Sequence, residues 1–184
     1  TVGPPLPGVE CLVVNDAGDV LPVGETGHLW VRGPNVFQGY WQNVEKTAES
    51  FTPDGYFKTG DLAVIDDEGY ISIVGRSKDL IITGGLNVYP KEIELVLDAI
   101  DGVMESAVIG LPHPDFGESV CAVIVSLPEV DLTPEFIFDQ IKTRLANFKT
   151  PKKIFFLQNL PRNTMGKVQK NQLREQFSDA AHNQ

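Results

Sequence analysis

The sequence predicts an α+β fold in which a small all-β segment precedes a compact α+β domain. Short apolar runs separated by turn-rich stretches occupy the first 77 residues, a pattern typical of strands joined by turns. After residue 79, helical apolar spacing alternates with strand-like runs, without a long βαβ rhythm. The stretch Gly-Arg-Ser-Lys-Asp at 75–79 lies between the two patterns and has no apolar period. We therefore predict two domains, residues 1–77 and residues 78–184.

The first domain is expected to hold short strands and one weak helix. The strand-like runs are 11–14, 28–32, 62–65 and 70–74. Asp-Asp-Glu-Gly separates the last two runs, and a turn sequence between two apolar runs predicts a hairpin. Residues 43–51 have helical composition, but Thr47 and the short length predict only a marginal helix.

Two proline-initiated helices are expected in the second domain. Pro90 suits the first turn of one helix. Its apolar face comprises Ile93, Val96, Leu97 and Ile100. Thr133 is a good N-cap for the other helix, with Pro134 at its first position and apolar residues at four-residue spacing as far as Leu145. Strand-like runs occupy 106–109, 120–127 and 154–157, and a terminal amphipathic helix contains Leu173 and Phe177.

Composition excludes several classes of function. A net charge of −10 would repel nucleic acid and anionic membrane surfaces. No apolar run approaches the roughly 20 residues that span a bilayer, and there is no secretory leader, so the cytoplasm is the expected compartment. Cys11 and Cys121 lie in apolar runs and are expected to be reduced core residues. His28, His113 and His182 are scattered, so no metal site is expected.

One segment of this acidic chain is basic. Residues 142–174 contain lysines and arginines but no Asp or Glu. The cations are Lys142, Arg144, Lys149, Lys152, Lys153, Arg162, Lys167, Lys170 and Arg174. A basic face of this kind could meet a phosphate-rich ligand or could be a solvated surface.

Asp61 and Arg76 form the first candidate site. Asp61 follows a Gly-containing turn in Lys-Thr-Gly-Asp, and such a carboxylate can accept two hydrogen bonds from the vicinal hydroxyls of a ribose. Arg76 ends the second strand of the predicted hairpin, which could bring its guanidinium close to Asp61 and to a phosphate. The alternatives are simple turn chemistry and a surface ion pair worth under about 1 kcal/mol.

Two glycine-containing loops form the second set of candidates. Gly84 and Gly85 follow an apolar strand and allow positive φ and close approach of the backbone to a ligand, although a tight turn explains them equally well. Lys167 follows a glycine in Asn-Thr-Met-Gly-Lys, where an exposed loop lysine is the alternative. This loop lacks the first glycine and the Ser/Thr of a P-loop.

These motifs occur together and in one order. The segments are GHLWVRGPNVFQGYW, GYFKTGDLA, GRSKDLIITGGLNVYPKEIE, VIGLPHPDFGE and LPRNTMGKVQK. They resemble successive blocks of the adenylate-forming superfamily of acyl-CoA synthetases, peptide-synthetase adenylation domains and luciferases. The resemblance covers essentially the whole chain, and the sequences of these motifs are most similar to those of malonyl-CoA synthetases.

The resemblance implies a fragment of an acid–thiol ligase that works in two steps. A carboxylic acid attacks the α-phosphate of ATP, with Mg²⁺, to give an acyl-adenylate, and the thiol of coenzyme A then displaces AMP. By position, Asp61 and Arg76 would bind the ribose and phosphate, and Lys167 would stabilise the charge that grows in the first transition state. Lys78 would be the hinge of a mobile C-terminal domain, and Gly84 and Gly85 would line the coenzyme A tunnel in the second step.

The resemblance also implies a missing partner. Residues 1–77 would be the β-rich end of a large AMP-binding N-terminal domain, and residues 78–184 the whole C-terminal domain. The acyl pocket and the Mg²⁺ site would lie upstream, so the chain alone is expected not to adenylate. Alternatives are a peptide-synthetase adenylation domain, a luciferase-like oxygenase, and a non-catalytic binding module of the same fold. The joint presence of Asp61, Arg76 and Lys167 disfavours the last.

Overall fold

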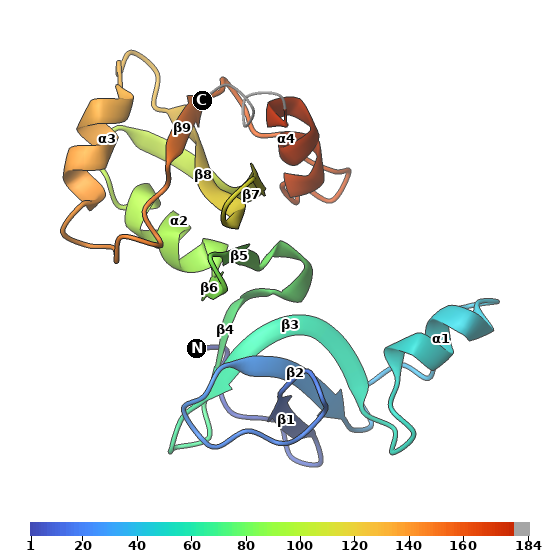
Figure 1. Ribbon diagram of the computed structural model, residues 1–184. Coiled ribbons are helices and arrows are strands. Elements are labelled where there is room, and N and C mark those ends of the chain that lie inside the picture. The colour runs from blue at the N-terminus through green and yellow to red at the C-terminus, as the bar shows by residue number, and fades with distance from the viewer. Residues whose placement is uncertain (179–184) are drawn as a thin grey trace. The chain divides into compact units, whose positions relative to one another are not determined.

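A computed structural model describes residues 1–178 of the chain (Figure 1). The chain divides into two compact units, with the division between Lys78 and Asp79. Helices and strands occur in both units, so the predicted α+β class is confirmed. The units are described one after the other.

The first unit is a four-stranded antiparallel meander. Its strands lie in chain order, as Figure 1 shows, and are β1 (Glu10–Val14), β2 (Gly27–Arg32), β3 (Phe57–Ile65) and β4 (Ile71–Arg76). One face of the sheet buries Val13, Leu29, Ala63 and Ile71. The predicted hairpin around 66–69 is confirmed, but β3 starts five residues before the expected Leu62. The early part of β3 was missed because its polar residues and Gly60 break the apolar alternation, and the register shifts between Leu62 and Ala63.

The weak helix that we expected is α1 (Val44–Ser50). Asn43 caps it, because its side-chain oxygen accepts a hydrogen bond from the Lys46 amide at 2.9 Å. Thr47, which we expected to weaken the helix, donates to the Asn43 carbonyl at 2.8 Å and accepts from the Tyr40 amide at 2.9 Å. This side chain therefore ties the preceding loop to the helix.

The second unit is built on a long hairpin. Its elements are the 3-10 turn η1 (Ser77–Asp79, shared with the boundary), β5 (Ile81–Thr83), β6 (Leu86–Val88), α2 (Pro90–Asp98), β7 (Val103–His113), β8 (Gly117–Ser126), α3 (Pro134–Ile141), β9 (Lys153–Phe156) and α4 (Lys170–Phe177). The strand order is β6-β5-β8-β7, and β9 runs parallel to β8. The predicted run 106–109 lies in the middle of β7, and 120–127 covers the C-terminal part of β8 and extends one residue beyond it. The elements β8, α3 and β9 form one βαβ connection.

Both faces of this sheet are covered. Val108 and Ile124 belong to the cluster that includes residues of α2 and α3, whereas Ile109 and Val123 belong to the cluster that includes Leu173 of α4. Neighbouring strand residues face opposite sides of a sheet, which explains why the apolar run of β8 is nearly continuous. Figure 1 shows α3 and α4 on opposite sides of the hairpin.

The helix starts were predicted more accurately than one helix end. Pro90 occupies the first turn of α2, and the Thr133 side chain accepts from the Phe136 amide at 3.2 Å, as an N-cap does. We expected α3 to continue to Leu145, but it ends at Ile141. Leu145 still packs on the same core from the following turn, so the four-residue spacing reflects burial beyond the helix.

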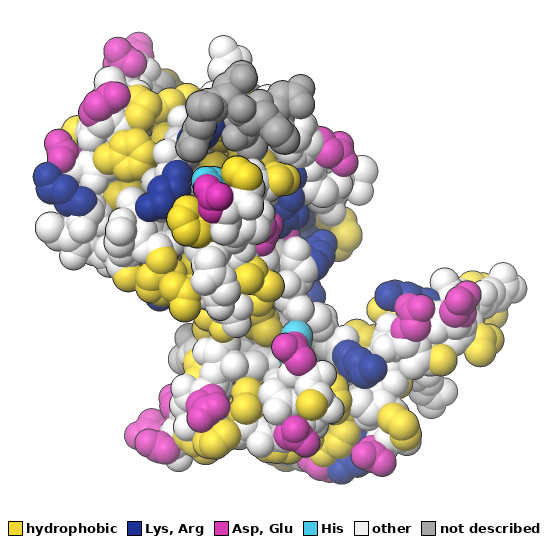
Figure 2. Space-filling model, in the orientation of Figure 1, with side chains coloured by type: hydrophobic (Ala, Val, Ile, Leu, Met, Phe, Trp, Pro, Cys, Tyr) yellow, Lys and Arg dark blue, Asp and Glu magenta, His cyan; other side chains and the backbone are white. Residues whose placement is uncertain are grey.

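The basic segment is largely neutralised by acids from elsewhere. Its ion pairs are Lys142–Asp139, Lys149–Glu92, Arg162–Glu105, Lys170–Glu94 and Arg174–Asp79. Figure 2 accordingly shows Lys and Arg side chains interspersed with Asp and Glu over the second unit. Five of the nine cations are therefore paired with carboxylates of the same unit, and the side chains of Lys149 and Lys170 are more than three-quarters buried, so these residues do not form a solvated basic face.

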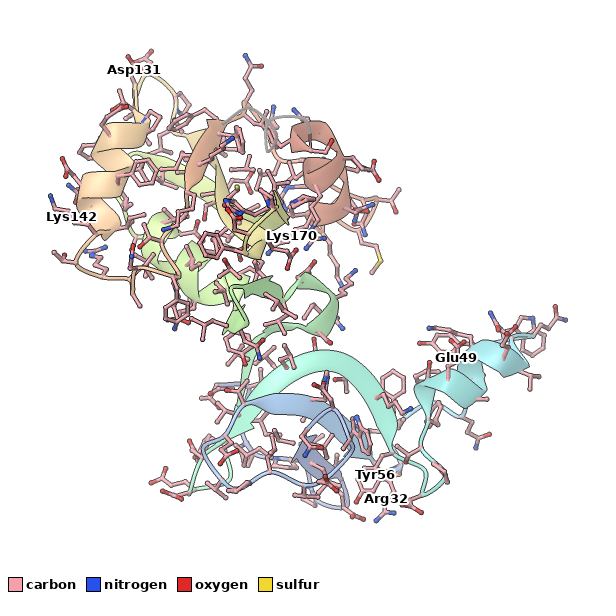
Figure 3. The ribbon with its side chains drawn as sticks, viewed as in Figure 1. Arg32, Glu49, Tyr56, Asp131, Lys142 and Lys170 are labelled. Atoms are coloured by element: carbon pink, nitrogen blue, oxygen red, sulfur yellow. The ribbon has the colours of Figure 1, made fainter. Side chains whose placement is uncertain are left out.

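Two of these ion pairs hold α4 in place. Lys170 Nζ lies 2.5 Å from Glu94 Oε1, and both side chains are at least four-fifths buried (Figure 3). The same Glu94 oxygen accepts from the Val108 amide at 3.0 Å. Four residues along α4, Arg174 Nη2 lies 3.1 Å from Asp79 Oδ1. The helix is thus joined both to α2 and to the residue that follows Lys78.

Both cysteines are free thiols, and Cys121 is buried on β8. Burial raises the pKa of Cys121 to about 11, against an ordinary value of 9.0. Because the folded pKa is the higher one, the stabilisation by the neutral thiol is complete below about pH 9 and is lost as the pH rises toward 11.

We expect the free energy of unfolding to fall by about 1–2 kcal/mol more in the wild-type chain than in Cys121→Ala between pH 8 and pH 10.5. Denaturant unfolding of both proteins at the two pH values measures this difference. Parallel losses in the two proteins would contradict it.

Candidate active site

The Asp61–Arg76 pair is the best-defined candidate site of the first unit. The two residues lie directly opposite each other on β3 and β4, and Arg76 Nε is 3.0 Å from Asp61 Oδ1. This confirms that the hairpin brings them together. Arg76 is about half exposed and Asp61 about one quarter, so the pair contributes little to folding stability and is accessible to a ligand.

The turn before Asp61 sets this geometry. Thr59 Oγ1 donates to the Leu29 carbonyl at 2.8 Å and accepts from the Asp61 amide at 3.0 Å. Arg76 Nη1 donates to the Thr59 carbonyl at 3.0 Å, beside Gly60, whose φ is +75°. Thr59 is therefore a supporting residue that our sequence analysis missed, although a threonine two residues before the carboxylate is a recognisable ST-turn signal.

Asp61 retains hydrogen-bonding capacity for a ligand. The Oδ1 atom of Asp61 forms the ion pair with Arg76, whereas no donor among residues 1–178 contacts the Oδ2 atom. A second cross-strand pair of the same kind, Glu10–Arg32, provides a contrast: Glu10 Oε2 accepts both from Arg32 at 2.7 Å and from Tyr56 at 2.9 Å. The hydrogen bonds from Arg32 and then Tyr56 lower the pKa of Glu10, and the Arg32 guanidinium lies over the Tyr56 ring (Figure 3).

Gly84 and Gly85 are the two residues of the loop between β5 and β6. Their φ angles are +56° and +79°, which is the type I′ geometry that glycine adopts without strain. The Gly84 amide donates to the Phe116 carbonyl at 2.9 Å. The predicted tight turn is therefore present, with exposed backbone that a ligand could approach.

Lys167 extends from a turn that one side chain organises. The Asn163 side-chain oxygen accepts from the amides of Met165 and Lys167 at 3.0 and 2.9 Å, and Gly166 has φ +78°. Arg162 pairs with Glu105 on β7 and donates to the Gly166 carbonyl at 2.7 Å. The loop backbone is thus fixed, while the Lys167 amine has no acidic or hydrogen-bonding partner within residues 1–178.

The predicted residues are distributed over both units. Asp61 and Arg76 belong to the first unit and meet there, whereas Gly84, Gly85 and Lys167 lie on loops of the second. Lys78 is the last residue of the first unit, within the turn η1. Asn163 was not singled out from the sequence, although an asparagine four residues before the lysine is a typical Asx-turn signal.

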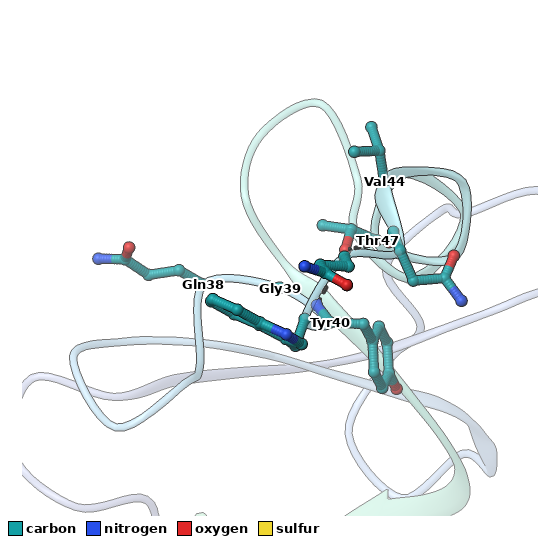
Figure 4. Close-up of a pocket in the computed structure, with 8 residues that line it drawn as sticks. Gln38, Gly39, Tyr40, Val44 and Thr47 are labelled. Atoms are coloured by element: carbon teal, nitrogen blue, oxygen red, sulfur yellow. Dashed lines mark hydrogen bonds between the residues drawn. The ribbon is translucent and has the colours of Figure 1, made fainter.

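Two surface pockets are lined by residues of α1 and the loops beside it, and neither is lined by Asp61, Arg76 or Lys167, although Lys58 lines one of them. Figure 4 shows one of them, beside α1, with Gln38, Tyr40 and Thr47 among the residues that line it. None of its eight lining residues has a carboxylate, amine or imidazole. Residues 1–178 also contain no group of three His, Cys, Asp or Glu side chains arranged for a metal ion; His182 lies outside that range. No helix in the same range is long and apolar enough to cross a bilayer.

Comparison with known families gives two matches. The AMP-binding enzyme C-terminal domain matches residues 92–167, and the AMP-binding enzyme family matches residues 1–41. The chain belongs to the AMP-binding enzyme family. This confirms the resemblance deduced from the motifs.

Relatives within the AMP-binding enzyme family include acid–CoA ligases. A 3-[(3aS,4S,7aS)-7a-methyl-1,5-dioxo-octahydro-1H-inden-4-yl]propanoyl:CoA ligase of Rhodococcus jostii is 44% identical over 96% of this chain and 32% of its own length. A long-chain-fatty-acid–CoA ligase of Yersinia pestis is 39% identical over 96% of this chain and 31% of its own. The chain therefore spans about a third of the length of these relatives.

Solved structures of AMP-binding enzymes share the fold. ATP-bound MatB from Rhodopseudomonas palustris is 54% identical, with a TM-score of 0.92 over 97% of this chain and 36% of MatB. The amide bond synthetase McbA from Marinactinospora thermotolerans is 36% identical, with a TM-score of 0.89 over 96% of this chain and 35% of McbA.

Proposed function

We propose that the chain is the C-terminal part of an ATP-dependent acid–thiol ligase, which makes an acyl-adenylate and then an acyl-CoA. The observation that carries the proposal is the pairing of Asp61 with Arg76 at a solvent-accessible turn, in a chain where the Lys167 amine has no partner among residues 1–178. The carboxylate of Asp61 can accept hydrogen bonds from ribose hydroxyls, and the guanidinium of Arg76 can bind a phosphate. The ammonium of Lys167 can stabilise negative charge that develops during the reaction.

In the first half-reaction the acid's carboxylate attacks the α-phosphorus of ATP and pyrophosphate leaves. Asp61 accepts hydrogen bonds from the ribose hydroxyls through its free Oδ2, and Arg76 approaches the ribose or phosphate. Lys167 bridges the attacking carboxylate and the α-phosphate oxygens, where negative charge grows in the transition state. In the proposed ligase the Mg²⁺ that accompanies ATP would be held by the upstream AMP-binding domain.

In the second half-reaction the thiol sulfur of coenzyme A attacks the acyl carbon and AMP leaves. The proposal assigns this step to the Gly84–Gly85 turn, after the C-terminal domain, residues 78–184, has moved about Lys78 relative to the AMP-binding domain that ends at residue 77. A comparison of MatB structures supports such a movement in a relative. ATP-bound and apo MatB are both 54% identical to this chain, yet their TM-scores are 0.92 and 0.72, so MatB adopts two conformations over this region.

We propose malonate as the acid. The support is the 54% identity with MatB, a malonyl-CoA synthetase, which exceeds the 44% identity with the Rhodococcus ligase. ATP and coenzyme A are cytoplasmic cosubstrates, so the proposed compartment is the cytoplasm.

The direct test is pyrophosphate release by the full-length protein with ATP and each of malonate, methylmalonate, acetate and palmitate, followed by chromatography for the acyl-CoA. We expect malonate to give pyrophosphate and malonyl-CoA. If the protein releases pyrophosphate but forms no thioester when coenzyme A is present, the proposed acid–thiol ligase activity is wrong. The similarity to McbA makes amide formation the second candidate, and an added amine in the same assay detects it.

Asp61→Asn should weaken ATP use without unfolding the first unit. Loss of the anionic acceptor removes a charge-assisted hydrogen bond, so the KM for ATP in the full-length protein should rise by roughly 10-fold or more. Glu10→Gln is a matched control, because it neutralises the other cross-strand carboxylate–arginine pair of the same sheet. Equal effects of the two substitutions on the KM for ATP would contradict the role of Asp61.

A further inference from the structure

We propose that Glu118 and Phe116 are positioning residues that hold the Gly84–Gly85 turn in the shape required for thiol transfer. This inference rests on the proposed function, in which the turn serves the second half-reaction. Neither residue belongs to the set predicted from sequence, and both lie at the β7–β8 connection, more than thirty residues away along the chain.

The strand that carries the turn is weakly attached to the sheet. β5 has three residues and meets β8 at one pair only, Thr83 with Gly117. The Glu118 carboxylate adds the next attachment, because its Oε2 atom accepts from the Ile82 amide at 2.8 Å. A charged side chain here replaces the missing backbone partner, and such charge-assisted bonds are about twice as strong as neutral ones.

The position of Glu118 is built into the sheet. Gly110 on β7 is buried, and a Cβ atom there would lie 2.4 Å from Glu118 Oε1 and 2.8 Å from its carboxyl carbon. Real atoms do not approach so closely, so a side chain at position 110 would force the Glu118 carboxylate to move from this position. Gly110 and Glu118 therefore form a matched pair, in which the absence of one side chain makes space for the other.

Phe116 contacts the turn itself. Its carbonyl accepts from the Gly84 amide at 2.9 Å, and its ring lies beside Gly84, where an added Cβ would be 3.4 Å from Cδ1. The ring also contacts the His113 ring, at 4.9 Å between centroids. The Thr83–Leu86 pair closes the turn of the two glycines. Phe116 contacts this turn directly, whereas Gly117 and Glu118 hold the strand β5 that leads into it.

The consequence is a preorganised turn whose support affects one half-reaction. In the proposed second half-reaction, the backbone of this turn lies close to coenzyme A. Displacing that backbone by even a small distance should therefore lower the rate of thioester formation. Adenylation, which the proposal assigns to Lys167, does not use this turn. Loss of the support should therefore separate the two steps.

The test compares both half-reactions in the full-length ligase. Pyrophosphate release reports adenylation, and single-turnover thioester formation from supplied acyl-adenylate and coenzyme A reports thiol transfer. Glu118→Ala should lower thiol transfer about tenfold, the effect of one lost hydrogen bond, with adenylation within twofold of wild type. Glu118→Gln keeps an acceptor oxygen for Ile82 and should restore most of the rate. Asp115→Ala, on the same loop, is the matched control and should leave both rates unchanged.

A second variant keeps the inference testable if Glu118→Ala folds poorly. Gly110→Ala retains the carboxylate but occupies its space, and it should lower thiol transfer to a similar extent. In the double variant Gly110→Ala/Glu118→Ala the methyl group fills the vacated space, so the loss should not exceed that of Glu118→Ala alone.

Wild-type thiol transfer in either Glu118→Ala or Gly110→Ala, or equal losses in both half-reactions, would overturn the positioning role. A wild-type protein that makes acyl-adenylate but no acyl-CoA would instead overturn the proposed function. The two failures are thus distinguishable.

Discussion

Lys167→Ala in the full-length ligase is expected to lower the rate of adenylation by about two to three decades, while thiol transfer from supplied acyl-adenylate stays near wild type. A preorganised charge aimed at a transition state is typically worth about 3–4 kcal/mol. The loop around Asn163 should survive the change, because its hydrogen bonds to Lys167 involve only the backbone of that residue. Pyrophosphate release and single-turnover thioester formation measure the two steps.

Lys142→Ala is the matched control, since Lys142 is an exposed lysine of the same unit and, within the described part of the chain, its side chain pairs with the neighbouring Asp139 alone. It should leave both rates unchanged. Equal losses of both half-reactions in Lys167→Ala would rule out a division of labour between the two loops. Full adenylation in that variant would remove Lys167 from the active site altogether.

Lys170→Met is expected to destabilise the second unit by about 3–5 kcal/mol. The substitution leaves the Glu94 carboxylate buried with no cation, and an uncompensated buried charge is costly. Urea unfolding of the 184-residue chain measures the effect, with far-UV circular dichroism as the probe. Both tryptophans, Trp30 and Trp41, lie in the first unit, so their fluorescence provides an internal reference that should unfold at an unchanged urea concentration.

Glu94→Gln/Lys170→Met should recover much of this loss, because it removes both charges and keeps an acceptor for the Val108 amide. Lys142→Met, at an exposed ion pair, should cost less than about 1 kcal/mol. A loss in Lys170→Met no larger than in Lys142→Met would show that the buried pair does not hold α4 in place.

Local signals predicted much of this structure from the sequence. Proline and threonine at helix starts, and turn residues between apolar runs, act within a few residues and were interpreted correctly at Pro90, Thr133 and Asp66. The approach of Arg76 to Asp61 was predictable for the same reason, because a hairpin fixes which residues lie opposite each other.

Long-range partners could not be predicted in this way. The acids that neutralise the basic segment come mostly from distant parts of the chain, so the sequence alone could not decide between a ligand-binding face and a solvated surface. Glu118 likewise has no local signal, since its partner Ile82 is 36 residues away. At Leu145 a local signal gave a wrong prediction. Its four-residue spacing from Ile141 suggested that the helix continues, whereas Leu145 is buried in the core after α3 has ended.

The ion pair between Arg174 and Asp79 affects how the second unit could move. It joins residues 95 positions apart and clamps the leading residue of the second unit to its last helix. In the proposed ligase, where the C-terminal domain turns about Lys78, this ion pair would make α4 turn together with Asp79. Arg174→Ala would remove that connection, so the bending of the backbone would extend over several residues after Lys78.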